Sequence, residues 1–226
     1  MSFLSPDAAV EANVYMFPKG YKHVRETQEI GTDLRGPWVH RRGYTYTGDW
    51  LNGMFHGHGT LTSPRGGWEY VGGFERHEME GLGELIKDSE FKYAGEFKYS
   101  RFDGQGVCIH KNGEKYEGEF QDGARYGKGT YTYPNGDNYV GDWKADARHG
   151  YGVWNETNVA RHSGEWKYGV KWGEGTFLVF GEQLFTGIWK DDKKWGGIEH
   201  DLKGNIRAIY VDGKAQKPQY SNIHYL

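Results

Sequence analysis

Tyr46-Thr47-Gly48-Asp49-Trp50 opens a pattern that recurs along most of this 226-residue chain. It consists of an aromatic residue, any residue, glycine, any residue, and a second aromatic residue. It occurs seven times, and the leading positions are Tyr46, Tyr70, Tyr93, Tyr116, Tyr139, His162 and Phe185. The first step is 24 residues, each later step is 23, and another glycine follows 11 residues after every leading position. Self-similarity at a fixed period of this length predicts a repeat protein.

Each unit predicts a β-hairpin. Side chains alternate between the two faces of a strand, so Tyr46, Gly48 and Trp50 share one face. In the second strand, Gly57, Gly59 and Leu61 share a face, and these glycines leave room for rings from the neighbouring strand. About six residues separate the two strands of a unit, and Asn-Gly and Asp-Gly pairs in the connections are typical of hairpins.

The composition agrees with many β-turns. The chain has 36 glycines, 16% aromatic residues and 6 prolines. This excludes collagen, which needs far more proline, and helical bundles, because each glycine in a helix interior costs about 1 kcal/mol. We therefore predict an all-β fold: an elongated, twisted, single-layer antiparallel β-meander that is solenoid-like and has no closed core.

The repeats divide the chain into four segments. Residues 1–33 carry few repeat features and predict an extended arm that orders on a partner. Residues 34–45 predict a capping half-repeat, and residues 46–199 hold the seven repeats. Residues 200–226 predict a C-terminal cap and tail, in which Ile206–Val211 can add a strand.

The repeated aromatic-x-Gly-x-aromatic and Gly-x-Gly elements resemble the MORN repeat. The layout, seven repeats with short ends, is similar to a small family member of ciliated and sperm cells. The resemblance implies a structural component of the cytoskeleton, located in the cytoplasm and most specifically in the axoneme of cilia or flagella. It implies axonemal or cytoskeletal proteins as partners. MORN repeats also occur in lipid-associated proteins and in accessory domains of enzymes, so a phosphoinositide-binding adaptor and an accessory subunit stay open as alternatives.

Nothing in the sequence predicts catalysis or a cofactor. The Gly-x-Gly pairs lie in β-repeats, without the strand-turn-helix context of a dinucleotide site, and no nucleophile elbow occurs. His56 and His58 have the spacing of a metal pair, but no carboxylate or cysteine set accompanies them, so we expect no metal. Cys108 is expected to be a packed residue. A net charge of -3 predicts no nucleic-acid partner and makes membrane binding an unfavoured alternative.

One face of the predicted sheet carries a row of large side chains. A single-layer sheet has no second layer to cover them, so we expect them either to pack on one another or to leave a groove for a partner such as an amphipathic helix. An uncapped sheet edge could also self-associate. The predicted groove residues are Tyr46, Trp50, Tyr70, Phe74, Tyr93, Phe97, Tyr116, Phe120, Tyr139, Trp143, Trp166, Phe185 and Trp189.

The opposite face predicts parallel rows of charge. Five of the seven positions after the central glycine are acidic, and four of the seven after the second aromatic residue are lysine. These rows form either a docking surface or a solvated face that prevents edge-to-edge stacking. The predicted outer charged face comprises Asp49, Glu96, Lys98, Glu119, Asp142, Lys144, Glu165, Lys167 and Lys190.

Overall fold

The computed structural model describes residues 38–40, 43–63, 65–88 and 90–218. The predicted arm, residues 1–33, lies outside the described residues, as do parts of both predicted caps. The described residues form 17 strands in one open antiparallel sheet and contain no helix, which confirms the predicted all-β class. The chain divides into two compact units, residues 1–127 and 128–226.

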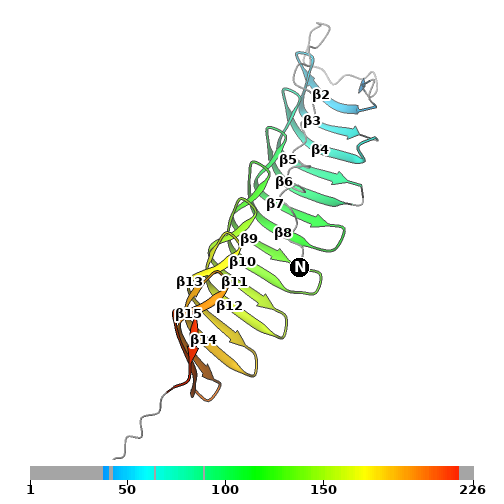
Figure 1. Ribbon diagram of the computed structural model, residues 1–226. Helices are drawn as coiled ribbons and strands as arrows, with labels where there is room; N and C mark the ends of the chain where they lie inside the picture. Colours follow the sequence, from blue (N-terminus) through cyan, green and yellow to red (C-terminus); the bar gives the residue numbers. More distant parts are fainter. Residues whose placement is uncertain (1–37, 41–42, 64, 89, 219–226) are drawn as a thin grey trace, which may run out of the picture. The chain divides into compact units, whose positions relative to one another are not determined.

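Unit 1 contains a short first strand and four of the predicted repeats. Each strand pairs with the next in the sequence, and Figure 1 shows the hairpins following one another in this order. The strands are β1 (Trp38–Val39), β2 (Thr45–Leu51), β3 (Met54–Ser63), β4 (Trp68–Glu75), β5 (Glu78–Lys87), β6 (Phe91–Lys98), β7 (Arg101–His110) and β8 (Lys115–Gln121), with β9 (Ala124–Thr132) crossing the unit boundary.

Unit 2 contains the remaining three repeats and a shorter final hairpin. The final hairpin pairs Tyr210 with Gly197 and Ala215, so the apolar run after the seventh repeat does add a strand. The strands are β10 (Asn138–Lys144), β11 (Ala147–Glu156), β12 (Ala160–Lys167), β13 (Val170–Val179), β14 (Gln183–Lys190), β15 (Lys193–Asp201), β16 (Ile206–Val211) and β17 (Lys214–Gln216).

The turns within the repeats are tighter than predicted. Only two residues connect the strands of each hairpin, and both have a positive φ, as in Asn52 (52°) and Gly53 (73°). Type I′ turns require this conformation because it matches the twist of the flanking strands. Tyr99 (φ 50°) and Ser100 (φ 61°) adopt it without glycine or asparagine, which is why turn residues alone did not reveal the hairpin length.

Neighbouring turns support one another. The second turn residue donates its backbone N–H to a carbonyl of the preceding hairpin, as Ser100 does to Met79 O at 3.0 Å. In return, the Met79 N–H donates to Ser100 Oγ at 3.1 Å. His77 Nδ1 accepts in the same way from the Phe55 N–H, and Asp192 Oδ1 accepts from the Lys171 N–H. These bonds offset part of the strain of positive φ at non-glycine residues.

Candidate functional site

The predicted groove residues form the core of each unit. Twelve of the thirteen are buried, and their exposed fractions do not exceed 7%; Trp50 is half-buried. This corrects the expectation that these rings line an open groove.

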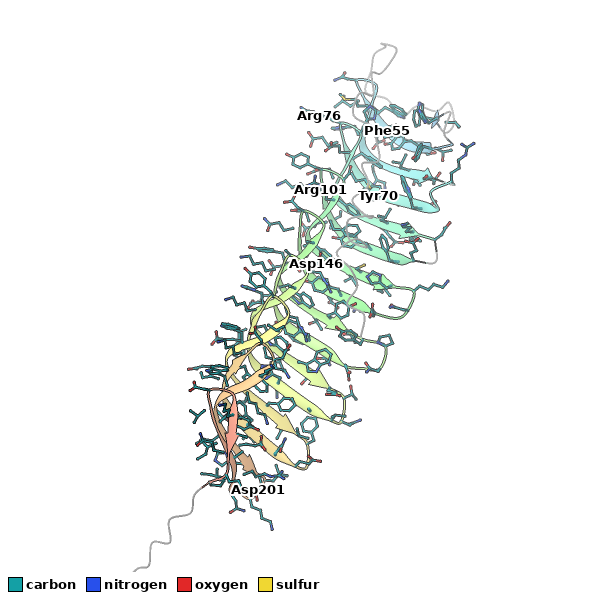
Figure 2. All side chains as sticks on the ribbon, in the orientation of Figure 1. Phe55, Tyr70, Arg76, Arg101, Asp146 and Asp201 are labelled. Atoms are coloured by element: carbon teal, nitrogen blue, oxygen red, sulfur yellow. The ribbon has the colours of Figure 1, made fainter. Side chains whose placement is uncertain are left out.

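The rings form a continuous ladder within each unit. Within a unit, a leading ring meets the second ring of its own repeat and that of the next repeat edge-on, as Tyr70 meets Phe74 (5.1 Å between centroids) and Phe97 (4.8 Å). In unit 2, Phe185 continues the ladder to Tyr210 at 5.5 Å. Edge-to-face pairs at this separation contribute about 0.5–1.5 kcal/mol beyond the area that they bury. Phe55 and Tyr70, labelled in Figure 2, lie among the strands of unit 1.

The leading tyrosines and the facing backbone explain two of the three repeated glycines. A Cβ on Gly59 would lie 2.5 Å from Tyr46 Oη, and one on Gly48 would lie 2.5 Å from Gly59 Cα and 2.6 Å from Tyr46 Oη. Tyr46 Oη donates to the Asp49 carbonyl at 2.8 Å, and the other four leading tyrosines make the equivalent bond. Burial raises the pKa of Tyr46 above its usual range, so the hydroxyl stays protonated and remains a donor.

The third repeated glycine has another function. Gly57 was expected to make room for a ring, but it lies in a β-bulge with a φ of 59°, next to the Asp49 carboxylate. Asp49 Oδ2 accepts the backbone N–H of His58 at 3.0 Å. Glu96, Asp142 and Glu165 make the same bond to the residue after their own bulge glycine.

The predicted outer charged face is therefore partly structural. Four of its acidic residues accept backbone N–H groups of the bulges, a role that was not predicted from the sequence: Asp49, Glu96, Asp142 and Glu165. Its basic residues Lys98, Lys144, Lys167 and Lys190 are exposed. Lys167 and Lys190 lie over the rings of Trp172 (4.5 Å) and Trp195 (4.3 Å).

The seventh repeat departs from this arrangement. Ile188 stands at the acidic position and is 40% exposed. Gly196, at the bulge position, lacks a positive φ, and the nearest atom to an added Cβ would be 3.9 Å away. Ile198 (37% exposed) lies on the same face as Ile188, so two apolar side chains stand on the outer face of this repeat.

His162 takes the leading position in the sixth repeat and is fully buried. Neither ring nitrogen has a hydrogen-bond partner within the described part of the chain. Burial, followed by the charges of Lys171 and Arg148, lowers its pKa to about 3. The imidazole is therefore neutral at pH 7 and serves as a packing ring, edge-on to Trp166 and Trp189.

The residues singled out for chemistry lie apart from any reactive cluster. Burial raises the pKa of Cys108 to about 12, so its thiol is unreactive at neutral pH. Among the residues described, no group of three or more His, Cys, Asp or Glu side chains is arranged to hold a metal. The same residues include no helix long and apolar enough to cross a membrane.

One set of candidate functional residues was not identified from the sequence. The second residue after each hairpin turn, which we call the post-turn position, packs beside the leading ring. It is apolar in the first three repeats, at Phe55, Met79 and Phe102, and Phe55 stacks on Tyr46 at 3.8 Å between centroids. In the later repeats it is cationic: Arg125, Arg148, Lys171 and Lys194. Aligning the repeats on their turns would have revealed this change.

Comparison with known families identifies the class of protein. A family model of the MORN repeat matches residues 46–68, 70–89, 93–115, 116–138, 139–154 and 162–178, more than half of the chain. The chain therefore belongs to the MORN repeat family. The family model does not match the seventh predicted repeat, although β14 and β15 form its hairpin and Phe185 and Trp189 extend the ladder. No curated protein matches the chain significantly.

Proposed function

We propose that this chain is a non-enzymatic scaffold that binds other proteins within a large cytoskeletal assembly, with the ciliary or flagellar axoneme as its location. The observation that carries the proposal is that almost all described residues belong to repeat hairpins whose large rings are used for internal packing. Such a protein offers a stiff surface rather than a reaction centre, because each repeat stabilises its neighbours and exposes side chains that differ from repeat to repeat.

Docking then uses exposed side chains and sheet edges in place of an aromatic groove. The hairpin turns expose Tyr99 (68%) and Tyr168 (69%), both at positions of positive φ. Arg76 and Arg101, labelled in Figure 2, lie at the turns of unit 1. Aromatic residues and arginine contribute much of the binding energy in protein interfaces, so these turns are natural contact points.

Cross-linking mass spectrometry of the native assembly from ciliated cells tests the proposal. We expect cross-links from this chain to axonemal proteins, and retention of the chain with detergent-resistant axonemes. A chain that is freely soluble in ciliated cells would contradict the axonemal location. Turnover by the isolated chain would contradict the non-enzymatic role.

A further inference from the structure

Unit 2 places three cations at its post-turn positions, one on each of β11, β13 and β15. We call Arg148, Lys171 and Lys194 the cation row. Their side chains pack on the aromatic ladder: the Arg148 guanidinium lies 4.2 Å from the Trp166 ring, and Lys171 Nζ lies 4.8 Å from the rings of both Phe177 and Trp189. Cations over ring faces are held in fixed directions, unlike flexible surface lysines.

The last member of the cation row shows which ligand suits these positions. Glu199 forms an ion pair with Lys194, and its Oε2 also accepts a hydrogen bond from Tyr210 Oη at 3.2 Å. Glu199 lies two residues after Gly197, the glycine that pairs with the central glycine of its repeat. The same place holds Trp154 in the fifth repeat and Phe177 in the sixth, so those repeats supply no carboxylate there.

Arg148 and Lys171 consequently lack such a partner. Within the described residues, neither forms an ion pair, and the Arg148 side chain makes one hydrogen bond, from a guanidinium nitrogen to Gly169 O at 2.8 Å. Both residues are half-buried, so neither side chain is sealed from solvent. Asp192 and Glu156 attract Lys171, and Asp192 also attracts Arg148, but among the described residues neither carboxylate forms an ion pair with these cations.

The half-buried position makes these cations costly without an anion. Burial lowers the pKa of both Lys171 and Arg148. An incoming carboxylate would recover this cost, because a charge-assisted hydrogen bond at a partly desolvated cation is stronger than one at a fully hydrated cation.

We propose that the cation row binds an acidic segment of a partner polypeptide, with carboxylates pairing to Arg148 and Lys171 as Glu199 pairs to Lys194. This rests on the proposed scaffold function and names the chemistry of its partner. Two strands per repeat at about 4.8 Å spacing separate successive cations by roughly 10 Å. A polyproline II segment with an acidic residue at every third position presents carboxylates about 9.3 Å apart on one side, which matches this spacing.

Fluorescence anisotropy with a labelled peptide of repeated Glu-Pro-Pro triplets tests the proposal on the full chain. We expect salt-sensitive binding, and no binding of the matched Gln-Pro-Pro peptide. Lys171→Met should weaken binding by about tenfold, as expected for loss of one charge-pair partner. The substitution keeps the packing volume, and methionine already occupies the equivalent position at Met79. Lys144→Met removes the same charge at an exposed site outside the row and should leave binding unchanged.

Three results would overturn the proposal: no binding of the Glu-Pro-Pro peptide, equal binding of the Gln-Pro-Pro peptide, or equal losses in Lys171→Met and Lys144→Met. Binding to phosphatidylserine vesicles that is lost in Lys171→Met, without peptide binding, would assign the row to lipid instead. Cross-linking of Lys171→Met in ciliated cells separates the two proposals. If the peptide does not bind but the axonemal cross-links are unchanged, the acidic ligand is refuted and the scaffold function is still supported.

Discussion

The two units share a strand pattern, but the first three repeats of unit 1 differ from the repeats of unit 2 at the post-turn position. In the first three repeats of unit 1, the post-turn residues Phe55, Met79 and Phe102 are buried and apolar. In unit 2, the cation row fills the same place with half-buried side chains, of which Lys194 pairs with Glu199. A long side chain covers the ring in both units, and whether its end carries a charge differs with its burial. That variation distinguishes the surfaces that the units offer to partners.

The largest effect on stability is expected when a post-turn residue of unit 1 is replaced by a cation like those of unit 2. Met79 is 2% exposed, so the charged end of the lysine in Met79→Lys has no path to solvent like that of Lys171. We expect a loss of about 3 kcal/mol in the free energy of unfolding, the usual cost of an unpaired buried charge. Urea denaturation measures it. A loss near zero would show that any post-turn position accepts a cation, and the difference between the units would carry no structural meaning.

Glycine substitution compares the ring contacts of the two units. A Cβ in Gly59→Ala would lie 2.5 Å from Tyr46 Oη and 2.6 Å from its ring, whereas one in Gly175→Ala would lie 2.8 Å from the His162 ring. We expect losses of about 3 kcal/mol for Gly59→Ala and about 1–2 kcal/mol for Gly175→Ala, because overpacking costs rise with the overlap. Gly196→Ala is the control, because its added Cβ would come no closer than 3.9 Å to another atom, and its unfolding midpoint should stay near that of the parent protein.

Acid should affect unit 2 through His162. Its pKa is about 3 in the folded chain and near 6.5 when unfolded, so between these values the unfolded state binds more protons. Stability therefore falls as the pH falls below 6.5, by about 2 kcal/mol between pH 7 and pH 5. His162→Tyr, which gives the repeat the leading residue of unit 1, should remove this part of the slope.

His110 in unit 1 also has a pKa lowered by burial, so it contributes a slope of the same sign. The comparison is therefore between His162→Tyr and the parent protein, measured as the unfolding midpoint at several pH values. If stability depends on pH equally in the two proteins, the pKa of His162 is not lowered in the folded state.

Replacing a cation in unit 2 with an apolar residue should increase the free energy of unfolding, whereas Met79→Lys should decrease it. We expect Lys171→Met to raise the free energy of unfolding by about 1 kcal/mol, because a half-buried cation without a carboxylate is costly. A loss of stability would mean that the ring contacts of Lys171 at 4.8 Å stabilise more than burial costs.

The acidic residues that accept a backbone N–H group of a bulge should contribute equally to stability in the two units. Glu96→Ala in unit 1 and Glu165→Ala in unit 2 each remove one bond to a backbone N–H, and we expect each to cost about 1 kcal/mol. Glu174→Ala, at an exposed site of the sixth repeat, is the control. A change in one unit alone would mean that the bulges also differ.

Much of the fold could be predicted because it is local. The alternation around Gly48 and the step of 23 residues establish strands, faces and repeats without any distant contact. The turns were missed because Tyr99-Ser100 and Asp191-Asp192 adopt positive φ without glycine, with support from the preceding turn. The bulges were not predicted because the hydrogen bond that the His58 N–H donates to Asp49 joins two strands, and their register could not be derived from the sequence.

The sequence by itself determined the repeat, the antiparallel pairing order and the face that receives the rings, because each depends on spacing along the chain. Only the tertiary structure decided what the rings do. Successive hairpins bring leading and second rings edge-on and bury them, so the predicted groove residues became core. It also decided which cations remain without a carboxylate, because pairing depends on what neighbouring strands place within reach. Glu199 meets Lys194, whereas Arg148 and Lys171 meet aromatic rings.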